Sequence, residues 1–128
     1  MSARDCTATL KPCPHRPNCV SSLAANHRQA IAPIRFDGVF ASPETGFQQL
    51  ARLLDELPGI TVVQHRGLYL HAECRSPVFR FVDDLEFCWD ASRQACQVRS
   101  ASRTGYYDFG VNRRRVERIR RLLQADAG

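Results

Sequence analysis

Two neighbouring segments in the second half of the chain constrain the fold most. Phe79–Trp89 and Cys96–Arg103 both alternate apolar and polar side chains along much of their length. Successive side chains of a β-strand point to opposite faces, so this period of two predicts two strands, each with one buried face. The polar stretch 90–95 between them predicts a tight connection. The chain is therefore expected to be built around an antiparallel sheet.

Further strands and two helices complete the predicted fold. Ile60–Gln64 and Leu68–Cys74 form a predicted hairpin, and Ile34–Phe40 is a candidate strand. A helix should begin after Ser42, a good N-cap followed by proline, and a last helix should begin at Asn112, a second N-cap residue. This order predicts an α+β domain in which an antiparallel sheet of about four strands carries two helices on one face.

The chain of 128 residues fits one domain. We expect residues 1–11 to be flexible and residues 12–124 to form the domain. Three prolines between residues 12 and 17 exclude a regular helix near the start. The following Asn18-Cys19-Val20-Ser21-Ser22 suits a fixed loop, so residues 12–33 are predicted to be an irregular but ordered arm.

The charge and the termini bear on location. The net charge is +5, and every basic residue except Lys11 is arginine, which a GC-rich bacterial genome alone would explain. No apolar stretch approaches the roughly 20 residues of a membrane-spanning helix. The first residues also lack the apolar core of a secretory signal, so the predicted location is cytoplasmic. In that compartment the six cysteines are not expected to form structural disulfides.

Acidic and arginine side chains cluster on the two central strands. Asp84 and Glu86 share one face of their strand, and Arg99 and Arg103 share one face of the next. If the strand register brings them together, these side chains pair across the hairpin. The favoured interpretation is a salt-bridge network that fixes the register. The alternative is a pocket that orients a small ligand. Asp83 falls on the apolar side of its strand, which predicts a bulge or a buried, paired carboxylate.

A small-anion site is the functional prediction. It would lie where the strand ending at Arg103, the turn to Gly110 and the start of the last helix meet, because backbone N–H groups at a helix start bind anions. The predicted ligand-binding residues are Arg99, Ser100, Ser102, Arg103, Asp108, Asn112, Arg115, Asp84 and Glu86. Asp108 could instead occupy this place itself, as an internal carboxylate that satisfies the same donors.

Other function classes remain as alternatives. An enzyme could use the carboxylates and arginines as its pocket, although no reaction is indicated. Cys13, His15 and Cys19 could handle thiols or a metal, but they lack the paired spacing of a structural zinc site. The arginines of the last helix could contact phosphates, yet no nucleic-acid-binding motif accompanies them. The preferred partners are a small anion or an acidic protein surface, and no cofactor is predicted.

Three ordered motifs carry a family resemblance: PCPxxPNCVSS, FVDDLEF and RSASRxGYxDxGVNRxR. Together they resemble the domain of unknown function 1499 family, from about Leu10 to Leu123. That family has no established activity, so the resemblance implies which residues belong together and adds no reaction. The matching positions are Pro17, Asn18, Cys19, Ser21, Ser22, Asp83, Asp84, Glu86, Arg99, Ser100, Ser102, Arg103, Gly105, Asp108, Gly110, Asn112 and Arg115.

Overall fold

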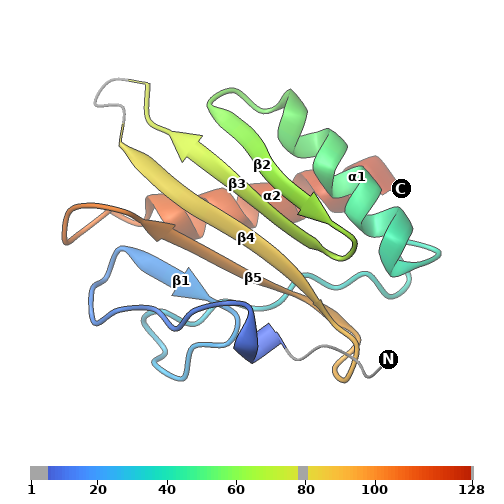
Figure 1. Ribbon diagram of the computed structural model, residues 1–128, viewed down its shortest axis with the longest axis horizontal. Coiled ribbons are helices and arrows are strands. Elements are labelled where there is room, and N and C mark those ends of the chain that lie inside the picture. The colour runs from blue at the N-terminus through green and yellow to red at the C-terminus, as the bar shows by residue number, and fades with distance from the viewer. Residues whose placement is uncertain (1–5, 78–80, 128) are drawn as a thin grey trace.

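The computed structural model describes residues 6–77 and 81–127, with backbone alone for 126 and 127. In this part of the chain a five-stranded antiparallel sheet carries both α-helices on one face; in Figure 1 α2 crosses behind the strands and α1 lies beside β2. The strand order is β1-β5-β4-β3-β2. The bounds are β1 Cys19–Ser21, β2 Ile60–Arg66, β3 Tyr69–Arg75, β4 Val82–Asp90 and β5 Ala95–Ser102.

The predicted α+β class is confirmed, and the fifth strand comes from the arm. Residues Cys19–Ser21 form β1 and pair with β5 along the lower edge of the sheet in Figure 1. The candidate strand Ile34–Phe40 is wrong: Ile34 makes a single bridge to Cys96, and a turn follows. Gly38 adopts a φ of 75°, which strand geometry does not allow. The start of the third predicted strand, residues 79–80, lies outside the described residues.

The first helix begins as predicted and the second does not. In α1 (Pro43–Glu56) the Ser42 side chain accepts a hydrogen bond from the backbone N–H of Thr45. The second helix, α2, spans Val111–Ala127, so Asn112 lies inside it rather than at its N-cap. Asp108 caps it instead: its carboxylate accepts the N–H groups of Gly110 and Asn112. This leaves the buried Asn112 side chain available for other contacts.

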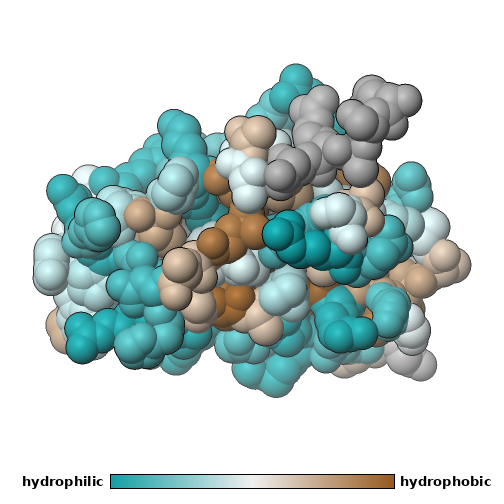
Figure 2. Space-filling model, turned by 90° about the horizontal axis from the view of Figure 1, so that it is seen from below, coloured by the Kyte–Doolittle hydropathy of each residue, from teal (hydrophilic) through white to brown (hydrophobic). Residues whose placement is uncertain are grey.

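The main core lies between the helices and the sheet. Buried side chains of α1 and α2 pack on the apolar faces of β3, β4 and β5. A smaller cluster lies on the opposite face, where η1 (Cys6–Ala8) brings Cys6 and Leu10 against Cys88 of β4. Figure 2 views the molecule from the side of β1 and the arm: hydrophobic residues gather near the middle of a mostly hydrophilic surface. Both faces of the sheet are thus partly covered.

Two disulfides overturn the expectation of reduced cysteines. Cys6 bonds to Cys88, and Cys13 bonds to Cys19, with Cα–Cα distances of 6.0 and 5.8 Å. Cys74 and Cys96 are free and buried. The sequence did not indicate the first bond because its partners are 82 residues apart and meet only when η1 docks on β4. None of the helices in the described residues has the length and apolar character needed to cross a bilayer.

We expect the long-range disulfide to stabilise the fold more than the short one. Cross-linking restricts the unfolded chain, and for separations of 82 and 6 residues the chain-entropy model gives about 4–5 and about 2 kcal/mol. The measurement is urea unfolding of the Cys6→Ala/Cys88→Ala and Cys13→Ala/Cys19→Ala double variants. Equal losses of unfolding free energy, or a larger loss in Cys13→Ala/Cys19→Ala, would contradict the expectation that the Cys6–Cys88 bond contributes more to stability.

Candidate functional site

The sheet divides the predicted ligand-binding residues between its two faces. The pairing of β4 with β5 runs without a bulge from Asp83–Ser102 to Asp90–Ala95. Strict alternation therefore sends Arg99 and Arg103 to the face away from the helices, here called the outer face. Ser100 and Ser102 point to the inner, helix-covered face. No single pocket can contain all nine predicted residues, and they form two clusters.

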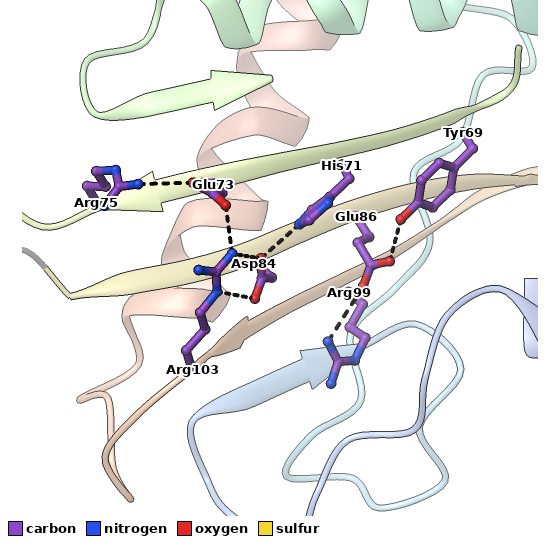
Figure 3. Close-up of polar contacts among 8 residues, drawn as sticks. All are labelled: Tyr69, His71, Glu73, Arg75, Asp84, Glu86, Arg99 and Arg103. Carbon is purple, nitrogen blue, oxygen red and sulfur yellow. Dashed lines mark hydrogen bonds and ion pairs between the residues drawn. The ribbon is translucent and has the colours of Figure 1, made fainter. Parts of the chain in front are cut away.

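The outer cluster centres on Asp84 (Figure 3). Arg103 donates from Nε to Asp84 Oδ2 and from Nη2 to Asp84 Oδ1, both at 2.8 Å. The same Nη2 also lies 2.7 Å from Glu73 Oε2. His71 Nε2 lies 2.8 Å from Asp84 Oδ1. The hydrogen bonds from Arg103 and His71 lower the pKa of the Asp84 carboxyl, although its burial opposes this. The cluster is internally satisfied.

A second branch of the outer cluster surrounds Glu86. Tyr69 donates its hydroxyl to Glu86 Oε2 at 2.6 Å, and Arg99 Nη1 lies 3.6 Å from Glu86 Oε1. Burial, and then the Glu86 carboxylate, raise the pKa of Tyr69, so this phenol stays protonated. Arg99 is largely buried, and its Nε has no hydrogen-bond partner among the described residues. The predicted pairing of Asp84 or Glu86 with Arg99 or Arg103 is confirmed.

The inner cluster centres on the buried amide of Asn112. Its Oδ1 accepts hydrogen bonds from Ser100 Oγ at 2.6 Å and Arg115 Nη1 at 2.9 Å. Its Nδ2 donates to Ser102 Oγ at 3.0 Å and to Asp108 Oδ2 at 2.8 Å. It also donates to the backbone oxygen of residue 18, which joins the arm to the helix. One amide thus holds together the arm, β5, the following turn and α2.

Asp83 is the buried, paired carboxylate that its position in the strand predicts. Arg115 donates from Nη2 to Asp83 Oδ2 at 2.8 Å, and both side chains are mostly buried. The pair connects α2 to β4 on the inner face. Together with Asp108, it supplies internal acceptors where the sequence predicted an external anion. A ligand role for the residues of the two clusters stays a prediction.

A pocket that the sequence did not indicate lies beside the inner cluster. It occupies about 280 Å³ between the α1–β2 connection, the end of β3 and the first half of α2. Its apolar lining comes mainly from Leu57, Pro58, Ile60, Val111 and Ile119, and its cationic lining from Arg75, Arg114, Arg115 and Arg118. Among the described residues no carboxylate lines it. The i, i+4 spacing of Arg114 and Arg118 places both on one helix face, but sequence alone does not show what lies opposite.

The arginine side chains that line the pocket differ in how many hydrogen bonds and ion pairs they already make within the protein. Arg75 pairs with Glu73 at 3.1 Å, and Arg115 is held by Asp83 and Asn112. Arg114 donates to the backbone oxygen of Phe109 at 2.7 Å. The Arg118 side chain is exposed and makes no hydrogen bond or ion pair with the described residues. Positive charge therefore exceeds the available acceptors here.

The thiol or metal hypothesis loses its ligands in this structure. Cys13 and Cys19 form a disulfide, so neither offers a thiolate. Among the described residues, no three histidine, cysteine or acidic side chains gather as they would around a metal ion.

Comparison with known proteins places the chain in a family. A family model described as "Protein of unknown function (DUF1499)" matches residues 9–123. The chain belongs to the DUF1499 family. No curated protein and no solved structure matches it. Membership in the DUF1499 family confirms the resemblance carried by the three motifs. It assigns neither a ligand nor a reaction.

Replacing Asp108 should destabilise the fold of this DUF1499 protein. In Asp108→Ala the N–H groups of Gly110 and Asn112 and the Asn112 amide lose their acceptor, at an expected cost of about 1–3 kcal/mol. Asp108→Asn keeps one acceptor oxygen and should lose less. Chemical unfolding monitored by circular dichroism measures both. Unchanged stability in Asp108→Ala would show that this carboxylate is not an internal cap.

Proposed function

We propose that the protein is a non-catalytic binding domain for a small organic anion, which it holds in the pocket beside α2. The observation that supports this most strongly is the one-sided charge of the pocket. Four arginines line it without a carboxylate, and Arg118 has no protein partner among the described residues. Guanidinium groups bind carboxylate and phosphate with paired hydrogen bonds, so an anion completes the site.

The apolar part of the lining defines the ligand further. Leu57, Ile60, Val111 and Ile119 face the same pocket as the arginines. An inorganic ion would leave this surface in contact with water, whereas a carboxylate or phosphate ester with a short apolar chain would cover it. The volume of about 280 Å³ lies near the lower end of the roughly 300–1,000 Å³ usual for small-molecule sites. The preferred ligand is therefore small and amphipathic.

The inner cluster supports the pocket through Arg115, which belongs to both. Asp83 and Asn112 fix the guanidinium of Arg115, one of the pocket's donors. A donor that is already held loses little conformational entropy when it binds. In this proposal Asn112 and Ser100, which the sequence predicted as ligand contacts, instead orient a pocket residue.

Two pKa shifts argue against two candidate catalytic groups. Burial raises the pKa of the Cys74 thiol at the pocket to about 11, so it is protonated and weakly nucleophilic at neutral pH. The pKa of the outer-face Tyr69 is also raised, away from the range useful for a general base.

The disulfides bear on the compartment. Structural disulfides persist in oxidising surroundings and are rare in the cytoplasm. The Cys6–Cys88 and Cys13–Cys19 bonds therefore support an oxidising compartment as the protein's place of action, in preference to the cytoplasm.

Calorimetric titration tests the ligand class. Octanoate and octyl phosphate should bind saturably and more tightly than acetate and inorganic phosphate, because each buried methylene contributes about 0.8 kcal/mol. Arg118→Ala should weaken octanoate binding at least tenfold, since it removes the free donor.

Arg121→Ala is the matched control, because Arg121 is exposed on the same helix and does not line the pocket. It should leave octanoate binding unchanged. If Arg118→Ala and Arg121→Ala lost equal affinity for octanoate, the binding would reflect only the general attraction of a basic protein for anions. If octanoate and acetate bound with equal affinity, the apolar lining of the pocket would not contact the ligand.

A further inference from the structure

The connection between β5 and α2 exposes aromatic side chains at one end of the molecule. It lies at the left end of the long axis in Figure 1, beyond the strands. Tyr106, Tyr107 and Phe109 are 66, 58 and 74 % exposed, and Val111, at the start of α2, is 39 % exposed. Four large apolar or aromatic residues within six positions are far more than scattered surface residues explain, and such patches mark interaction sites.

The backbone of this aromatic loop, residues 106–111, holds Phe109 outward at a cost. Phe109 has a φ of 56°, in the left-handed region that bulky residues rarely occupy. Strain of this kind persists only where surrounding contacts impose it, and it concentrates at functional positions. Here the Asp108 carboxylate accepts the N–H of Gly110, and Arg114 donates to the carbonyl of Phe109. A glycine at position 109 would fit this backbone better, yet Phe109 has the highest exposure among the large hydrophobic side chains of the described residues.

Arginines flank the aromatic loop. Arg16, from the arm, donates to the backbone oxygen of Gly105 at 3.5 Å, and Arg114 contacts the loop from α2. The acid within the loop, Asp108, uses both its oxygens on Gly110 and Asn112. The loop therefore combines exposed rings with cations, while its carboxylate is engaged inside the protein.

We propose that this aromatic loop docks on an anionic membrane surface. Tyrosine and phenylalanine at a protruding loop suit the headgroup region, where rings lie among acyl carbons and hydroxyls meet water. The flanking arginines would contact lipid phosphates, and the net charge of +5 adds long-range attraction. A protruding loop fits a deformable lipid surface, whereas a protein partner would have to offer a matching hollow.

The proposed membrane surface and the pocket are adjacent, and the two proposals rest on different observations. Val111 and Arg114 belong to the aromatic loop or contact it, and both also line the pocket. Membrane docking rests on the exposed rings and the backbone of Phe109, and it holds whether or not the pocket binds octanoate.

Vesicle co-sedimentation tests the proposal. The protein should partition onto phosphatidylcholine vesicles containing phosphatidylserine and only weakly onto phosphatidylcholine alone, and raised salt should weaken binding. Phe109→Gly should reduce partitioning at least tenfold without lowering the melting temperature, because it removes the exposed ring and relieves the left-handed backbone. Tyr106→Ser should also reduce binding. Val63→Ser, which removes an apolar side chain 47 % exposed on β2, is the matched control and should leave it unchanged.

Three results would overturn the proposal. The first is that the wild-type protein does not bind phosphatidylserine vesicles. A protein partner would then be the remaining occupant for the aromatic loop. The second is equal partitioning of Phe109→Gly and wild type. The third is a marked fall in the melting temperature of Phe109→Gly, because that would make the ring a structural element of the loop.

Discussion

The uninterrupted pairing of β4 with β5 decides which face of the sheet each side chain of these two strands occupies. Its register places Glu86 opposite Arg99 and Asp83 opposite Ser102. A shift of one residue would send every side chain of a strand to the other face, exposing Leu85 and Phe87 and burying Asp84 and Glu86. The core on the inner face and the ion pairs on the outer face therefore require the same register, and each reinforces the other.

This register also explains how one short sequence motif serves two faces. Along RSASR the arginines point to the outer face and meet the carboxylates of β3 and β4. The serines point inward and meet Asn112. Buried ion pairs contribute little net stability but are costly to break singly. Here the outer pairs hold β3, β4 and β5 in one register, and the Asp83–Arg115 pair ties β4 to α2 and so positions Arg115.

Local patterns in the sequence predicted most of the helices and strands. They did not predict the contacts between segments that are distant in the sequence. The alternation of apolar and polar side chains along β4 and β5 was sufficient to predict an antiparallel sheet and the ion pairs across its strands. It also predicted that Asp83 is a buried, paired carboxylate. The Ser42 cap located α1 for the same reason, since capping is a local interaction. Asn112 was misplaced because an N-cap preference also suits a buried amide, and the competing cap, Asp108, lies only four residues earlier.

The pocket and the long disulfide could not be predicted by local reasoning. The pocket needs Leu57 and Arg118, which are adjacent only after α2 packs beside the α1–β2 connection. Cys6 meets Cys88 only after η1 docks on the outer face. The expectation of reduced cysteines followed from an assumed compartment rather than from the residues themselves. The place of the unpaired Arg118 side chain is likewise set by tertiary packing and not by a local sequence pattern.

We infer that the arginines paired across the sheet hold the fold together and that those lining the pocket bind the anion. Nuclear magnetic resonance of the arginine Nε–Hε groups during octanoate titration tests it most directly, because each guanidinium reports separately. Saturable shifts are expected at Arg118 and Arg114, with Arg99 and Arg103 unchanged. Saturable shifts at Arg99 and Arg103, with Arg114 and Arg118 unaffected, would contradict it and place the anion on the outer face of the sheet.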